Sequence, residues 1–245
     1  MVGITPFMEG QQIWERISNP LVHDGVRFPQ MGPAPWVESE KYPPWDMRLD
    51  VLVCSSDPDR RRLPRAGSYV LNYGDGIVSV GAPYKREMKP YPLDRASQRG
   101  AFAREHAYRF RDFLDGLSNT LLVSESKLSG PKVCKGIKDL ALIPSLVLEA
   151  AKKPDHEHWP KGRNSCWADG SLRSLGFQTI LPPNSPSATS DRGELEGVMS
   201  ASSHHAGGVF ILFGDGAVQY ISATVDAGDP TAASVGEQAN EPASR

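Results

Sequence analysis

A histidine pair and an aspartate near the C-terminus are the residues best suited to chemistry in this chain. His204 and His205 precede an apolar run at residues 209–213, and Asp215 follows it. A histidine and a carboxylate can form a general base with its orienting group, or bind a metal ion. If the run is an extended strand, the ten residues from His205 to Asp215 span up to about 33 Å. The two side chains therefore cannot touch, and Asp215 is predicted to be a turn residue.

Residues 208–222 predict the β-hairpin that positions these histidines. The first half is apolar on both faces, as in a central strand, and an Asp-Gly pair then provides a tight turn. With a two-residue loop, Phe210 faces Ile221, and His205 lies opposite Asp226. We therefore predict that a hydrogen bond to Asp226 orients the His205 imidazole. In a strand, the neighbouring His204 points to the opposite face from His205, so at most one of the two histidines can join a given site.

Other side chains could bind metal ions. Carboxylates at turns can ligate calcium, although no D-x-D-x-D spacing is present. The candidate calcium ligands are Asp57, Asp115 and Asp169. His156 and His158 have the alternate spacing that places two imidazoles on one face of a strand, but no third ligand is obvious. No other cofactor is expected.

The three cysteines are Cys54, Cys134 and Cys166, and none belongs to a C-x-x-C motif. A zinc site would need histidine or carboxylate ligands as well, so buried thiols or a single Cys134–Cys166 disulfide are favoured. No serine has the G-x-S-x-G context, and no Gly-rich phosphate loop is present. Because no nucleophile, base and orienting group can be assembled, we expect a protein that is not an enzyme.

Aromatic residues are frequent in the loop-like segments. Those that stand out are Trp36, Tyr42, Trp45, Trp159 and Trp167. Exposed aromatic platforms bind sugars or partner proteins, whereas buried ones cover a small core, and burial is favoured. If exposed, Trp36, Trp45 and Trp167 are the candidate ligand-binding residues.

Composition limits the class of protein. The chain has 245 residues, with 27 Lys and Arg against 29 Asp and Glu, and a formal net charge of −2, which argues against a nucleic-acid-binding protein. Its 23 Gly and 21 Pro indicate many turns. No apolar run approaches the ~18–20 residues of a membrane helix, so we expect a soluble chain. Residues 1–231 are predicted to form a single globular domain and residues 232–245 a disordered tail.

The expected fold class is α+β, with a short N-terminal helix on an antiparallel sheet that is wrapped by long loops. The helix is predicted to start at Thr5-Pro6 and to stop near Asn19. A helix is also expected after Pro144. Strands are predicted at residues 51–54, 121–123 and 177–181, and a second hairpin at residues 68–80.

Six ordered segments resemble those of a large bacterial family of unknown function. Its C-terminal H-x(9)-D-G signature is matched by His205, Gly207, Gly208, Asp215 and Gly216. Its D-G-T-S-N-T-L-x-V-G-E segment is matched by Asp115, Gly116, Ser118, Asn119, Thr120 and Glu125. The other matching segments are residues 4–9, 51–58, 68–74, and a block comprising 167–170 and 177–186.

The resemblance implies a pilin- or pseudopilin-like protein, similar to type II secretion protein G, in the cell envelope or outside the cell. The prepilin leader and membrane helix of that family have no counterpart before Met1, so membrane attachment is expected only through such a missing helix. The family has no established reaction. We expect a role in assembly or surface display through self-assembly or protein partners. The alternative is a module that binds a glycan or other polymer, such as an extracellular polysaccharide, through loop aromatics.

Overall fold

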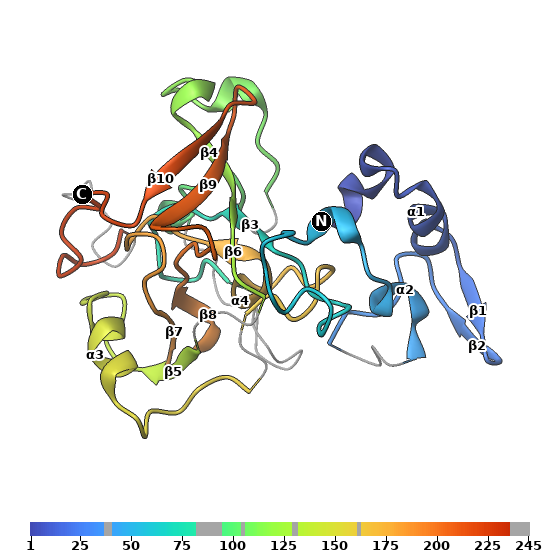
Figure 1. Cartoon of the computed structure of the whole chain (residues 1–245), viewed down its shortest axis with the longest axis horizontal. Helices are drawn as coiled ribbons and strands as arrows, with labels where there is room; N and C mark the ends of the chain where they lie inside the picture. Colours follow the sequence, from blue (N-terminus) through green and yellow to red (C-terminus); the bar gives the residue numbers. More distant parts are fainter. Residues whose placement is uncertain (37–40, 82–94, 104–105, 129–131, 161–162, 236–245) are drawn as a thin grey trace.

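A five-stranded sheet forms the centre of the molecule (Figure 1). The structure is a computed structural model that describes residues 1–36, 41–81, 95–103, 106–128, 132–160 and 163–235. The strand order is β10 (Val218–Ser222), β9 (Gly208–Phe213), β4 (Leu121–Glu125), β3 (Tyr69–Asn72) and β6 (Gly176–Phe177). Neighbouring strands are antiparallel, except that β6 runs parallel to β3.

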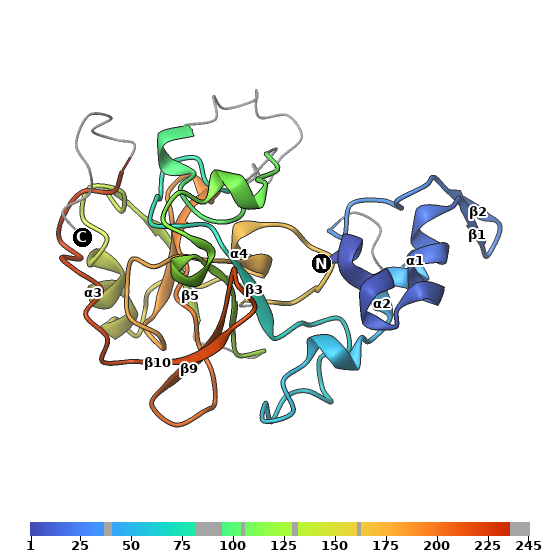
Figure 2. The same ribbon diagram turned by 90° about the horizontal axis from the view of Figure 1, so that it is seen from above.

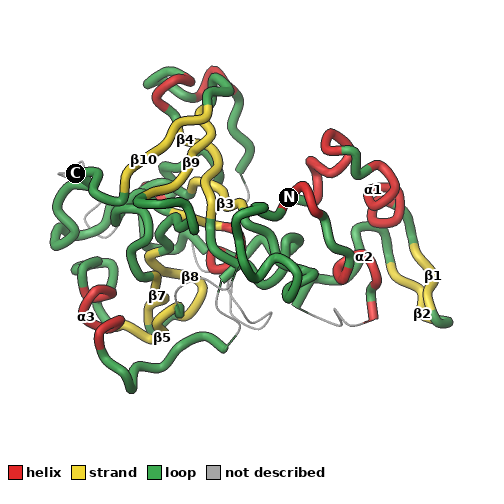
Figure 3. The backbone as a smooth tube through the Cα atoms, in the orientation of Figure 1, coloured by secondary structure: helices red, strands yellow, loops and turns green. Residues whose placement is uncertain are grey.

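A second, three-stranded sheet lies beside the first. It contains β5 (Val133–Ile137), β7 (Ser187–Ser190) and β8 (Gly193–Val198), with β5 parallel to β7. The helices of the body are η3 (Asp50–Leu52), η4 (Arg95–Ser97), η5 (Phe110–Asp112), η6 (Leu117–Asn119), α3 (Leu146–Lys152) and α4 (Leu172–Leu175). The predicted α+β class is confirmed. Long loops connect these elements (Figure 3).

The N-terminal residues form a unit that extends to one side of the body (Figure 2). It contains η1 (Val2–Met8), α1 (Gln11–Ser18), α2 (Pro43–Asp46) and the hairpin of β1 (Leu21–His23) with β2 (Val26–Phe28). The predicted single helix is divided at Glu9, whose φ of 58° interrupts the helix. Its end at Ser18 agrees with the prediction. The main contacts of α1 are with η1 and α2 rather than with the sheet.

Two buried tryptophans join this unit to the body. Trp45 and Trp167 meet edge to face with ring centroids 5.8 Å apart. Each indole N–H donates to a backbone carbonyl, that of Pro33 for Trp45 and that of Met47 for Trp167. Both side chains are at most 3% exposed. The prediction that Trp45 and Trp167 bind a ligand is therefore wrong. Both side chains fill the core, where no ligand can reach them.

Two predicted strand segments have a different structure. Residues 51–54 begin in η3, because the Leu52 and Val53 amides bond carbonyls three residues earlier. The apolar run thus marks a turn that buries Leu52 and Val53 and exposes Val51. In the predicted hairpin at 68–80, only β3 is a strand, and its partners are β4 and β6. Of the predicted strand at 177–181, only Phe177 is in a strand.

The C-terminal hairpin is present, but its register differs by one residue. Phe210 pairs with Tyr220 instead of Ile221. The loop has three residues, because Phe213 donates to the Ala217 carbonyl and Gly216 adopts a φ of 90°. This positive φ is available to glycine without strain. The predicted strand at 121–123 lies within β4, and the helix predicted after Pro144 is α3.

The start of the predicted disordered tail packs on the body. Ser234 is 2% exposed, its Oγ accepts the Ile77 N–H, and its N–H donates to the Ala141 carbonyl. Residues 232–235 therefore belong to the folded part, and residues 236–245 lie outside the described residues. None of the helices in the described ranges has the length and apolarity needed to span a membrane.

Candidate functional site

Three distant segments bring a thiol, a carboxylate and an imidazole together. The Sγ of Cys54 lies 3.8 Å from Nε2 of His205, and the same nitrogen lies 3.2 Å from Oε1 of Glu125. Glu125 is buried, whereas Cys54 and His205 are partly exposed. Each residue comes from a different segment of the family resemblance. The cluster therefore places three of the predicted motifs at one point.

Each member of this cluster is held by a hydrogen bond to its own segment or to a neighbouring one. The Cys54 N–H donates to Ser68 Oγ, and the His205 N–H donates to Ser203 Oγ. Glu125 ends β4 beside the start of β9, and its Oε2 accepts the Phe210 N–H at 2.9 Å. The first two bonds fix the backbone of Cys54 and His205, and the third fixes the Glu125 carboxylate.

The imidazole of His205 therefore has Glu125, not Asp226, as its carboxylate neighbour. The predicted Asp226 partner depended on a two-residue loop, and the three-residue loop removes that register. The Asp226 carboxylate instead accepts the Gly228 N–H. His204 has its Nε2 3.6 Å from Oδ2 of Asp57, which lies in the turn after Cys54. The two histidines thus point to different groups, as predicted.

The arrangement differs from a catalytic triad. In a triad, the nucleophile and the orienting carboxylate lie on opposite ring nitrogens of the histidine. Here both Cys54 and Glu125 face Nε2.

Tyr69 pairs with Glu125 across β3 and β4. Burial raises the pKa of the Tyr69 phenol, and the nearby Cys54 and Glu125 raise it further, so this hydroxyl keeps its proton at neutral pH.

The motif residues at the other end of the hairpin form turns. The Asn119 amide donates to the Asp115 carbonyl, and the Thr120 hydroxyl donates to the carbonyl of Gly116, which has a φ of 84°. Ser118 is exposed on this turn. The turn bonds the hairpin loop through Gly214 N–H and the Thr120 carbonyl.

Asp215 has the predicted turn role, because its Oδ1 accepts the Ala217 N–H. Gly207 and Gly208 occupy the opposite end of the hairpin, where Ala223 donates to the Gly207 carbonyl.

The three candidate calcium ligands do not share a site in the described part of the chain. The Asp57 carboxylate accepts the Leu128 and Asp59 N–H groups. Asp169 accepts hydrogen bonds from Ser171 and Ser174. The carboxylates of Asp57 and Asp169 thus accept hydrogen bonds from backbone and hydroxyl groups, and the calcium prediction is corrected for the described residues, where the three aspartates form no common ligand group.

All three cysteines are free, so of the two alternatives for Cys134 and Cys166 the structure has the buried thiols and not the disulfide. Cys134 instead lies 3.8 Å from His158 Nε2. The other histidine of that segment, His156, is within hydrogen-bond distance of the Lys135 carbonyl through its Nε2. The sequence pattern does not predict either cysteine–histidine pair, because the two residues are 151 positions apart in Cys54–His205 and 24 positions apart in Cys134–His158.

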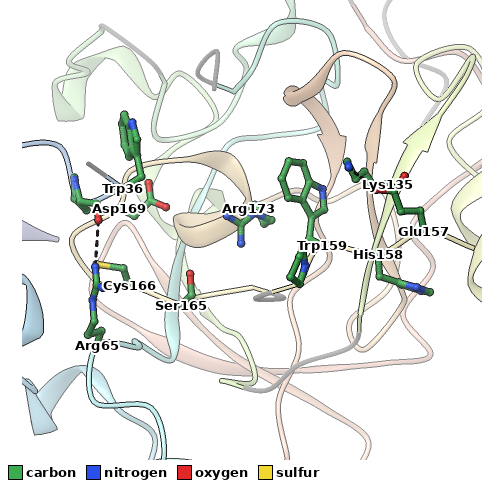
Figure 4. A pocket seen from close by; sticks show the side chains of 12 residues that line it. Trp36, Arg65, Lys135, Glu157, His158, Trp159, Ser165, Cys166, Asp169 and Arg173 are labelled. Carbon is green, nitrogen blue, oxygen red and sulfur yellow. Dashed lines mark hydrogen bonds and ion pairs between the residues drawn. The ribbon is translucent and has the colours of Figure 1, made fainter. Parts of the chain in front are cut away.

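A cleft of about 610 Å³ lies elsewhere, between the second sheet and the loop that connects β2 to α2 in the N-terminal unit (Figure 4). Trp36, which is 55% exposed, lines one end, and Lys135 and His158 line the other. Arg173 lies between them, 5.1 Å from the Trp159 ring centre. Of the three candidate ligand-binding tryptophans, only Trp36 therefore lies in an open cleft.

Comparison with known families decides the assignment. Residues 1–228 match the family model described as "Protein of unknown function (DUF1559)". The chain belongs to the DUF1559 family. This confirms the resemblance to a bacterial family of unknown function. Searches of curated proteins and of solved structures found no match to this DUF1559 chain. The geometry described above therefore carries the functional argument.

Proposed function

We propose that this DUF1559 chain is a non-enzymatic, pilin- or pseudopilin-like protein of the cell envelope or extracellular space that acts in assembly or surface display. The observation that supports self-assembly best is the edge strand β10. It pairs with β9 on one side only in the five-stranded sheet. The outer face of this hairpin exposes Phe210, Val218 and Tyr220.

Edge strands of proteins that stay monomeric usually carry charges, prolines or bulges that prevent pairing with another chain. The sequence of β10, Val-Gln-Tyr-Ile-Ser, contains no charged residue and no proline. Val218 is 62% exposed and Tyr220 is 44% exposed. A second copy of the chain can add its own β10 across a two-fold axis, because the same residues then meet on both sides.

A lysine at Val218 should weaken this association. We expect the natural chain to form concentration-dependent oligomers, and Val218→Lys to raise the dissociation constant by at least about 10-fold, because a charge on an edge strand opposes its pairing with another chain. Sedimentation equilibrium over a concentration series measures both values.

The matched control is Phe7→Lys, which places a lysine on an apolar residue that is 87% exposed in the N-terminal unit. It should leave the dissociation constant unchanged. A natural chain that stays monomeric at the highest attainable concentration, or equal weakening by both variants, contradicts self-assembly through β10.

The non-enzymatic part of the proposal is supported by the common use of Nε2 in the Cys54–Glu125–His205 cluster, which leaves no relay from carboxylate to thiol. Turnover of a panel of ester and glycoside substrates that is lost in His205→Gln would contradict it.

A second candidate function is favoured by the cleft of Figure 4. Indole rings stack on sugar faces. Trp36, Trp159 and Arg173 line this cleft together. A glycan or other extracellular polymer is therefore the ligand class we propose for it.

Trp36→Ala tests this second function. Removing the exposed indole should weaken binding on a glycan array by at least about 10-fold, as for other aromatic residues that dominate a binding surface. Phe110→Ala removes another exposed aromatic ring, 69% exposed on η5, and should leave binding unchanged. Trp45→Ala is not a suitable test, because Trp45 is buried. Absence of any array signal from the natural chain contradicts the glycan-binding function.

A further inference from the structure

We propose that Cys54, Glu125 and His205 form a binding site for a divalent transition-metal ion, for which zinc fits best. Among the described residues, theirs is the group in which three side-chain ligand atoms of histidine, cysteine or carboxylate type lie within 4.8 Å of one another. They belong to the loop after η3, the end of β4 and the loop before β9. The site is independent of the self-assembly proposed above.

The separations of the ligand atoms match a tetrahedral ion. Zinc binds sulfur at about 2.3 Å, imidazole nitrogen at about 2.0–2.1 Å and carboxylate oxygen at about 2.0–2.2 Å. Tetrahedral angles between such bonds place sulfur and nitrogen about 3.6 Å apart, and nitrogen and oxygen about 3.4 Å apart. The corresponding distances here are 3.8 Å and 3.2 Å. Little movement is needed to admit the ion.

The ligand types select the metal. Thiolate and imidazole favour zinc and its neighbours in the first transition series, whereas calcium and magnesium prefer oxygen ligands. The three protein ligands leave one tetrahedral position open. Because Cys54 and His205 are partly exposed, water or an exogenous ligand can reach that position.

The surrounding hydrogen bonds hold the ligands in place for an ion. Glu125 keeps Oε1 for the metal, because its other oxygen, Oε2, already accepts the Phe210 N–H. The backbone amides of Cys54 and His205 are bound by Ser68 and Ser203. The Phe210 N–H is an outer partner that orients the Glu125 ligand, and the two serine bonds fix the backbone from which Cys54 and His205 extend. An ion at this point also ties three segments of the native state together, so its binding stabilises the fold.

The chain contains a matched control for this site. Cys134 and His158 have the same Sγ to Nε2 distance, 3.8 Å. No third ligand of the described residues joins them, and the Glu157 carboxylate is paired with Lys135. Burial raises the pKa of the Cys134 thiol, which disfavours the thiolate that a metal requires. Cys134 and His158 therefore show what a cysteine–histidine pair binds without the third ligand that Glu125 supplies in the proposed site.

The experiment uses the full chain after treatment with a chelator and a reductant. Titration with zinc chloride in a calorimeter should show one ion per chain. Titration with cobalt(II) should give the near-ultraviolet charge-transfer absorption of a thiolate–cobalt bond. Cys54→Ser should abolish that absorption, and Cys54→Ser and His205→Gln should each weaken zinc binding more than about 100-fold, beyond the loss typical of an outer partner. Cys134→Ser should change neither measurement.

Circular dichroism separates loss of the site from loss of the fold. Cys54→Ser conserves side-chain size, so we expect its spectrum to equal that of the natural chain in chelator. Added zinc should raise the melting temperature of the natural chain and of Cys134→Ser, but not of Cys54→Ser. No thiolate–cobalt absorption in the natural chain, or zinc binding that survives in Cys54→Ser and disappears in Cys134→Ser, would overturn the proposal. The cobalt result stands even if a variant fails to fold.

Discussion

Replacing Gly208 with alanine is expected to lower the free energy of unfolding by about 3 kcal/mol, at the upper end of the cost of overpacking. A Cβ at Gly208 would lie 2.2 Å from the Ile221 carbonyl oxygen and 2.7 Å from the Tyr220 ring. Both belong to β10, the strand opposite. Because one of the two atoms is backbone, a change of side-chain rotamer cannot relieve the contact, and β9 and β10 must separate.

Gly216→Ala is the comparison in the same hairpin. Its φ of 90° is unfavourable for alanine, but no atom lies within 4 Å of the added Cβ. We expect a loss of about 1–2 kcal/mol from the strained backbone alone. Urea denaturation followed by circular dichroism measures both free energies. A loss at Gly208 no greater than that at Gly216 would show that the strands do not approach as closely as described.

The second large effect is expected for Trp167→Ala, which should lower the free energy of unfolding by about 3–5 kcal/mol. Trp167 is 2% exposed and contacts Trp45 edge to face. Its indole N–H donates to the Met47 carbonyl, so the truncation also leaves that acceptor without its indole donor. The lost contacts are those between the N-terminal unit and the body.

Trp36→Ala controls for the loss of an indole as such. Because Trp36 is 55% exposed, its removal should change stability by no more than about 0.5 kcal/mol. Thermal denaturation with limited proteolysis measures stability and detachment of the N-terminal unit together. Equal destabilisation by the two variants would contradict the different burial of these side chains.

Local signals in the sequence predicted the elements that depend on local chemistry. The turn at Asp115–Thr120, the strand that follows it and the helix after Pro144 were all found from residue type. The hairpin register was wrong by one residue, because Asp-Gly fits both a two-residue loop and the observed three-residue loop with glycine at positive φ. The second sheet was missed. Its strand β8 buries Glu194 and Glu196, which are paired with Arg173 and Arg192, so hydrophobic alternation is absent.

In the candidate site, too, the sequence indicates a single residue but not the distant residues that lie next to it. His205 was identified as the histidine to consider, but its partner Glu125 lies 80 residues earlier. A partner at that separation follows from strand order, and β4 lies next to β9 only because the sheet is built from distant segments. Cys54 was assigned to a strand and not to a site. The resemblance does place all three residues in motifs, so membership in these motifs is the signal that the sequence offers.

The strand order also determines when this chain can fold during synthesis. β3 and β4 leave the ribosome early and can pair at once, but the other edge of β4 is covered only by β9, near the C-terminus. A nascent chain thus carries an open edge of β4 from the synthesis of residue 125 until β9 follows at residue 208, and in that interval aggregation or chaperone binding competes with folding. Completion of the sheet therefore waits until β9 and β10 have been made. Chains truncated before residue 208 are expected to retain that open edge permanently.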